Sequence, residues 1–122
     1  MGNTILIVDD SAPFRAMAAE LLAEHGFDVL MTAGDGEQAL AAVGHVCPDG
    51  VLLDINLPGR DGFAVASSLA AVCPTARIVL TSSDFGRLPD GVLSSCAAAA
   101  FVAKEELAGA DLRRLFTSPA GT

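Results

Sequence analysis

Residues 5–11 read ILIVDDS, and this stretch decides the fold. Four consecutive branched apolar residues predict a strand that is buried on both faces, which is typical of a parallel sheet. Two acidic residues end the strand, and the serine that follows them can cap a helix. The stretch therefore predicts a strand that leads through an acidic turn into a helix.

The same alternation continues along the chain. Further apolar runs predict strands at 27–31, 51–53, 77–80 and 100–102, with helical patterns between them. Five strands alternating with helices predict a doubly wound parallel sheet with right-handed crossovers. In such a sheet a ligand binds outside the carboxyl ends of the strands. The chemistry of this chain is therefore expected at that edge.

The helices differ in how clearly the sequence marks them. The first is expected from Ser11 to Gly26, the second at 37–46, the third at 62–72 and the last around 108–116. Their expected buried faces comprise Phe14, Met17, Ala18, Leu21 and Leu22; Ala39, Ala42, Val43 and Val46; and Ala108, Leu112, Leu115 and Phe116. The fourth helix is weakly marked. Its apolar spacing is workable (Leu88, Val92, Leu93, Cys96), but Gly86, Pro89 and Gly91 crowd its start.

Length and charge limit the possible functions. The chain has 122 residues, which fits one domain, expected at 1–116 with a short flexible tail at 117–122. Its formal net charge of −8 would repel a phosphate polyanion, so this chain alone is not expected to bind nucleic acid. Because no secretory signal and no membrane-length apolar run is present, we expect a soluble cytoplasmic protein with no membrane partner.

The cysteines number three: Cys47, Cys73 and Cys96. They form no CxxC pair and have no neighbouring histidine. We expect all three to be small apolar residues in a reducing compartment.

Charged and polar side chains follow the predicted strands. Asp9 and Asp10 end the first strand, Asp54 the third, Thr81 the fourth and Lys104 the fifth. Carboxylates gathered at one edge repel one another unless a positive charge lies among them, and Mg²⁺ prefers oxygen ligands of this kind. The backbone carbonyl of Asn56 could add another ligand.

Such a site can carry out phosphoryl transfer. Asp54 is the candidate nucleophile and would form an acyl phosphate. Lys104 would neutralise charge on the transferred oxygens, and Thr81 would donate a hydrogen bond to one of them. Both histidines, His25 and His45, are expected on the surface, which disfavours a phosphohistidine carrier.

Four runs in order resemble the two-component response-regulator receiver family of the CheY-like superfamily. They are ILIVDDS at 5–11, VLLDINLPGRDG at 51–62, IVLTSS at 78–83 and FVAKEEL at 101–107. The resemblance implies flavodoxin-like strand order 2-1-3-4-5 with helices on both faces. It also implies that Asp54 is the phospho-acceptor, that Asp9, Asp10, Asp54 and Asn56 form the Mg²⁺ shell, and that Thr81 and Phe101 are a switch pair.

The implied function is a phosphorylatable switch, not an enzyme with a separate substrate. A sensor histidine kinase or phosphotransfer protein would supply the phosphoryl group, with Mg²⁺-dependent autophosphorylation and slow dephosphorylation. A downstream effector would bind the face formed by the fourth helix, fifth strand and fifth helix, and phosphorylation could produce a homodimer. By the same resemblance, Asn56 and Ser83 lie where the family tunes hydrolysis.

Other functions remain open at this point. The chain could be the receiver of a longer DNA-binding transcriptional regulator, or a degenerate receiver that serves only as an interaction module. A haloacid-dehalogenase-like phosphatase also uses an aspartyl phosphate, but Asn56 stands where its second acid is expected. A flavodoxin-like electron carrier would place a phosphate against Asp9 and Asp10, which would repel it.

Overall fold

The computed structural model describes residues 3–59, 61–82 and 98–116. The fourth helix expected from Leu88 to Cys96 and the tail expected at 117–122 lie outside these residues. Ser83, which was expected near the site, lies outside them as well.

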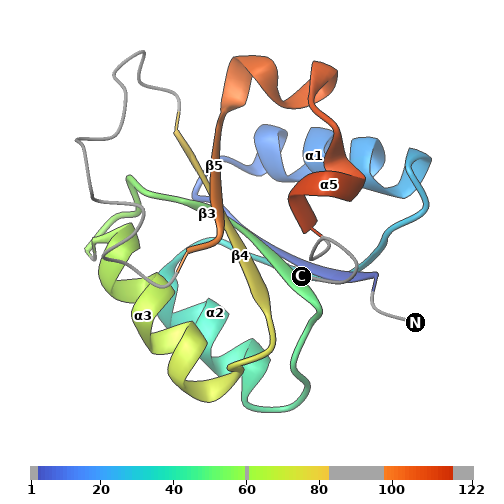
Figure 1. Ribbon diagram of the computed structural model, residues 1–122. Helices are drawn as coiled ribbons and strands as arrows, with labels where there is room; N and C mark the ends of the chain where they lie inside the picture. Colours follow the sequence, from blue (N-terminus) through green and yellow to red (C-terminus); the bar gives the residue numbers. More distant parts are fainter. Residues whose placement is uncertain (1–2, 60, 83–97, 117–122) are drawn as a thin grey trace.

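The sheet has five parallel strands in the order β2-β1-β3-β4-β5 (Figure 1). They are β1 (Thr4–Val8), β2 (Asp28–Ala33), β3 (Gly50–Asp54), β4 (Arg77–Ser82) and β5 (Ala100–Ala103). The predicted doubly wound sheet and its strand order are confirmed.

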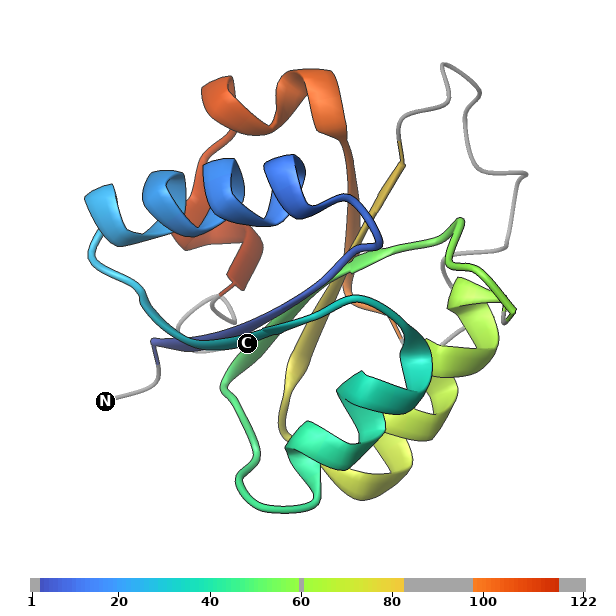
Figure 2. The same ribbon diagram turned by 180° about the vertical axis from the view of Figure 1, so that it is seen from behind.

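Helices cover both faces of the sheet. One face carries α1 (Ala12–Glu24), the 3₁₀ helix η1 (Lys104–Gly109) and α5 (Leu112–Phe116), and the other carries α2 (Gly36–Val43) and α3 (Gly62–Val72) (Figures 1 and 2). Within the described ranges, no helix combines the length and the apolar composition that a bilayer crossing requires.

Two apolar cores lie on opposite sides of the sheet because successive side chains of a strand point to opposite faces. On β1, Ile5 and Ile7 belong to the core beneath α1 and α5. Leu6 and Val8 belong to the core beneath α2 and α3. All four are at most 1% exposed. The run therefore forms a strand that is buried on both faces, as predicted.

Three expectations about the helices are wrong in detail. The second helix ends at Val43, with Gly44 as its C-cap, so Val46 lies beyond it and is 48% exposed. Met17, expected in the core, is 43% exposed. The last helix is interrupted between η1 and α5, so Ala108 does not share a continuous α-helical stripe with Leu112.

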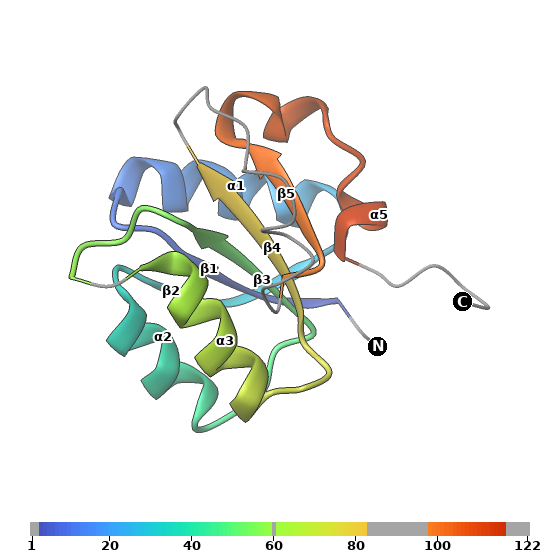
Figure 3. The ribbon, with the colours of Figure 1, turned by 60° about the vertical axis from the view of Figure 1, so that its left-hand side comes forward.

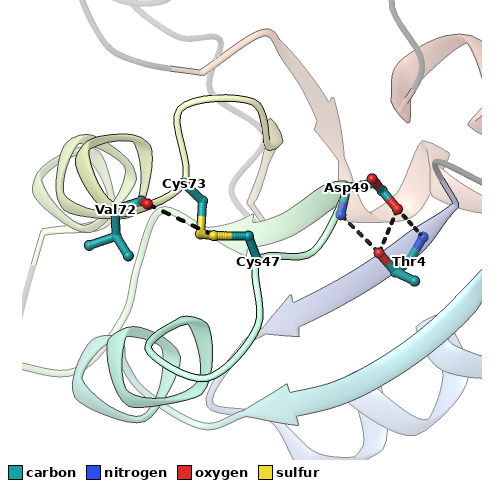
Figure 4. The surroundings of a disulfide bond; sticks show 5 residues. All are labelled: Thr4, Cys47, Asp49, Val72 and Cys73. Atoms are coloured by element: carbon teal, nitrogen blue, oxygen red, sulfur yellow. Dashed lines mark hydrogen bonds between the residues drawn. A yellow bond between two sulfur atoms is a disulfide. The ribbon is translucent and has the colours of Figure 1, made fainter.

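The expectation for two of the cysteines is also wrong: Cys47 and Cys73 form a disulfide bond (Figure 4). Cys47 lies between α2 and β3, and Cys73 caps the end of α3. Both connections lead into strands at the amino-terminal edge of the sheet, so two residues 26 positions apart in the chain become neighbours. Cys96 lies outside the described residues.

Candidate functional site

The carboxyl ends of the strands bring the polar residues to one edge of the sheet. Asp9 directly follows β1, Asp54 ends β3, and Lys104 directly follows β5. In the strand register Asp54 lies opposite Thr81. Figure 3 shows the carboxyl ends of β3, β4 and β5 pointing to this edge.

The turn after β1 is held by hydrogen bonds to Asp9. Its carboxylate Oδ1 accepts from the backbone N–H of Ser11 at 2.8 Å, and its backbone carbonyl accepts from Arg15 Nη1 at 2.6 Å. Ser11 Oγ in turn accepts from the backbone N–H of Phe14 at 3.3 Å and caps α1. The aspartate side chain is therefore fixed by the start of the helix behind it.

Lys104 lies between two of the carboxylates. Its Nζ is 2.6 Å from Asp9 Oδ2 and 3.4 Å from Asp54 Oδ2. The same ammonium lies 4.4 Å from the ring centroid of Phe14, within the range of a cation–π contact. The lysine is thus positioned by β5, by two acids and by an aromatic ring of α1.

The electrostatics of the edge are dominated by negative charge. Carboxylate oxygens of Asp9, Asp10 and Asp54 lie within 4.8 Å of one another. Asp9 and Asp54 are buried, whereas Asp10 is exposed. Three carboxylates around one ammonium leave an excess of negative charge, so these residues could hold a metal cation.

Burial changes the acidity of the site. Desolvation raises the pKa of Asp54, and the charge of Asp9 raises it further, against the lowering effects of the Asn56 N–H and of Lys104. Burial alone would lower the pKa of Lys104, but its hydrogen bond to Asp9 and the charge of Asp54 outweigh burial and raise it. Lys104 therefore stays cationic.

The side chain of Thr81 is buried at this edge of the sheet. Its Oγ1 is fully buried and has no hydrogen-bond partner in the described part of the chain. Its backbone carbonyl accepts from the N–H of Ile55 at 3.0 Å. A buried hydroxyl without a partner is costly unless a ligand supplies one.

The loop after Asp54 is fixed by short contacts. The backbone N–H of Asn56 donates to Asp54 Oδ1 at 2.9 Å, and Asn56 Nδ2 donates to Ser82 Oγ at 3.1 Å. Gly62, the first residue of α3, donates its N–H to the Ile55 carbonyl at 3.1 Å. A Cβ at Gly62 would lie only 2.4 Å from Ile55 Cα, so glycine is required for this close approach.

The structure brings together the predicted residues of the edge. These are Asp9, Asp10, Asp54, Asn56, Thr81 and Lys104. Phe101 lies in β5 opposite Leu80 of β4, where it is partly exposed and packs against the core under α2 and α3. Both histidines are exposed.

Two residues at the site were missed from the sequence. Phe14 was placed in a buried helical stripe, but its ring contacts Lys104. Arg15, which holds the turn through the Asp9 carbonyl, was not singled out. Both lie in the first helical turn after the acidic pair, and that closeness in sequence is the signal that could have found them.

Comparison with known proteins agrees with this geometry. A family model described as the response regulator receiver domain matches residues 5–112. Chemotaxis protein CheY of Bacillus subtilis is 36% identical over 83 residues, which are 68% of this chain and 69% of that protein. DNA-binding response regulator MtrA of Mycolicibacterium paratuberculosis is 43% identical over 82 residues, which are 67% of this chain and 36% of that protein.

A solved structure is also similar. The response regulator protein TrrA of Thermotoga maritima, in complex with Mg²⁺ and BeF, superposes with a TM-score of 0.77 at 31% identity, covering 93% of this chain and 98% of that one. Several relatives are longer. The chain spans 24% of a protein-glutamate methylesterase of Anaeromyxobacter dehalogenans and 38% of the transcriptional regulator PdtaR of Mycobacterium tuberculosis.

Proposed function

The chain belongs to the response regulator receiver domain family, and on that premise we propose that it accepts a phosphoryl group on Asp54 in two-component phosphorelay signalling. One observation carries the proposal: the buried Thr81 hydroxyl lacks a partner beside Asp54, in the described residues, while Lys104 faces the same carboxylate. A phosphoryl group on Asp54 would give the Thr81 hydroxyl a partner and would give the Lys104 ammonium a further one.

The transfer needs no general base. The ionised carboxylate of Asp54 attacks the phosphorus of a phosphohistidine on a sensor kinase or phosphotransfer protein. A P–O bond forms, the P–N bond breaks, and the leaving imidazole takes a proton. Lys104 and the Thr81 hydroxyl stabilise negative charge on the transferred oxygens. Because burial raises the pKa of Asp54, the nearby ammonium also helps to keep the attacking form available.

We assign Mg²⁺ to the acidic edge. Asp9, Asp10 and Asp54 would hold it, together with the backbone carbonyl of Asn56, and the excess of carboxylates over cations fits a hard divalent ion. When bound, Mg²⁺ would neutralise charge on the phosphoryl oxygens. Autophosphorylation would depend on it, and slow hydrolysis would return the domain to its resting form.

The proposed output is a conformational switch. The Thr81 hydroxyl would turn toward the phosphoryl group, and Phe101, in the next strand, would turn into the space this leaves. Next to Phe101 a groove of about 300 Å³ lies between β5 and α5, lined by Arg77, Arg114 and Leu115 among others. A downstream effector would bind this face, and a phosphorylation-dependent homodimer is an alternative occupant.

The setting we propose is the cytoplasm, with no membrane partner and no nucleic-acid contact by residues 1–116, the proposed receiver unit. The domain would act as a switch that catalyses its own phosphorylation and hydrolysis, not as an enzyme with a separate substrate. As in longer relatives, it could also serve a DNA-binding transcriptional regulator as its receiver. Membership of the receiver family sets aside the phosphatase and electron-carrier alternatives.

The test is the intact mass of the protein after incubation with acetyl phosphate and Mg²⁺. We expect the wild-type chain to gain one phosphoryl group and Asp54→Asn to gain none. Asp35→Asn is the matched control, since Asp35 caps α2 through Gln38 N at 2.8 Å and asparagine can cap equally well. Equal labelling of Asp54→Asn would overturn the assignment, and an unlabelled wild type would support the degenerate receiver.

The switch has a separate test. Thr81→Ala should still be phosphorylated, but it should lose the change in hydrogen exchange that a phosphoryl mimic produces in peptides covering residues 83–101. If wild-type exchange changes only beside Asp54, the switch mechanism is wrong.

A further inference from the structure

The disulfide bond encloses the part of the chain that carries the acceptor. Cys47 lies three residues before β3, and Cys73 directly follows α3. The loop closed by the bond therefore contains β3, Asp54, the turn after it and all of α3. The Cα atoms of the two cysteines are 5.6 Å apart, an ordinary separation for a disulfide.

This loop is coupled to the site at one end and to the bond at the other. At the site end, Gly62 packs directly on Ile55 in the turn after Asp54. At the far end, the backbone N–H of Cys73 closes α3 on the Leu69 carbonyl at 2.8 Å. Neither cysteine contacts the polar edge, so the bond can open without removing a residue from the site.

The two sulfur-bearing residues differ in accessibility. Cys47 is exposed, whereas Cys73 is 1% exposed. The neighbouring side chains are accessible as well: Val46 is 48% exposed and Val72 is 50% exposed. Figure 4 shows the bond between the end of α3 and the connection that leads into β3. A small molecule can therefore reach the bond from the Cys47 side.

We propose that Cys47 and Cys73 form a reversible redox site, whose reactants are low-molecular-weight thiols and disulfides of the glutathione class. In the oxidising direction, the Cys47 thiolate attacks the small disulfide, forming a mixed disulfide and releasing one small thiolate. Cys73 then loses its proton to solvent and attacks the Cys47 sulfur, releasing the second small thiolate. Two protein thiols are oxidised, and one small disulfide is reduced to two thiols.

Forming or breaking the bond changes the conformational freedom of the loop between Cys47 and Cys73, which carries Asp54. Closing a loop restricts the locally unfolded chain more than the folded one. The oxidised form therefore holds β3 and α3 together. The reduced form lets α3 open locally. While α3 is in its closed position, the contacts of the site are the same in both forms. This inference goes beyond phosphoryl acceptance and does not depend on it. In a cytoplasmic protein, such a bond is expected to be transient and redox-sensing.

The first experiment follows the bond itself. A Cys96→Ala chain, which keeps only the two paired cysteines, is equilibrated in buffers of varied reduced and oxidised glutathione, then acid-quenched, alkylated and weighed. We expect a single two-electron transition from dithiol to internal disulfide. With Cys73→Ala added, Cys47 should accumulate as the mixed disulfide with glutathione. With Cys47→Ser added instead, Cys73 should remain unmodified in the folded protein.

The second experiment reads the consequence in the unsubstituted chain. Hydrogen exchange of peptides covering residues 50–72 should be slower in the oxidised protein by about tenfold or more. Peptides from α1, outside the loop, serve as the internal reference, and their exchange should slow less than that of residues 50–72 because they feel the bond only through global unfolding. The proposal is overturned if oxidised glutathione never forms the internal bond, or if residues 50–72 exchange equally fast in both forms. An unlabelled Asp54 would refute the phosphoryl proposal but leave this one intact.

Discussion

Breaking the bond between Cys47 and Cys73 should cost stability that can be worked from the loop it closes. The sequence separation is 26 residues. In the chain-entropy treatment, a loop of this size restricts the unfolded state by about 12 cal/mol/K, or about 3.5 kcal/mol at 25 °C. For 122 residues, at roughly 2.1 cal/mol/K each, the entropy of unfolding is about 256 cal/mol/K. The melting temperature should therefore fall by about 14 °C on reduction.

The assay is thermal unfolding followed by circular dichroism, with the wild-type chain in the presence and absence of a phosphine reductant. Comparing two redox forms of one sequence avoids any packing change at the buried Cys73. The Cys96→Ala chain is the control and should respond equally. A fall of less than about 3 °C, with complete reduction verified by thiol counting, would refute the loop-entropy reasoning.

Three further predictions concern the acceptor loop, a hydrogen bond and the metal. Gly62→Ala should destabilise the fold by about 3 kcal/mol and slow phosphorylation, because its Cβ would overlap Ile55; Gly109→Ala, with open space around it, should do neither. Hydrogen bonds from Thr4 at 2.6 and 3.0 Å lower the pKa of Asp49, so its stabilisation is present above about pH 4 and lost as pH falls through the folded pKa. Asp49→Asn should therefore cost about 1 kcal/mol at pH 7 in urea titrations, and a cost that persists at pH 2 would contradict this cause. Millimolar Mg²⁺ should raise the melting temperature by binding only the native state, and an unchanged value would count against a formed metal site.

The sheet could be predicted because local sequence determines it strongly. Apolar runs placed all five strands, although β2 is exposed at Leu30 and Met31, and α3 was predicted with the bounds 62–72 that it has. The end of α2 was not predicted, because the helix was expected to continue to Val46 while Gly44 already ends it. Whether a helix residue is buried also depends on how the helix packs against the sheet. The helical pattern alone was therefore insufficient to predict that Met17 is exposed.

The polar edge could be predicted for a topological reason: parallel strands deliver their carboxyl ends to one place. That rule located Asp9, Asp54 and Lys104 without any knowledge of distances. The contact of Phe14 with Lys104 depends on where α1 lies relative to the start of η1, which sequence spacing does not specify. The bond from Cys47 was missed because its partner is distant in sequence and no motif joins them.

The proposed function depends most directly on the covalent attachment of a phosphoryl group to Asp54. An acyl phosphate can be trapped by borohydride, which reduces the aspartyl group to homoserine. The protein, phosphorylated with acetyl phosphate and Mg²⁺, is trapped, digested and sequenced by mass spectrometry. We expect homoserine at position 54 alone, and only when the phosphodonor is present. Homoserine at Asp9 or Asp10 instead, or a phosphoryl group found on a serine or threonine, would contradict it.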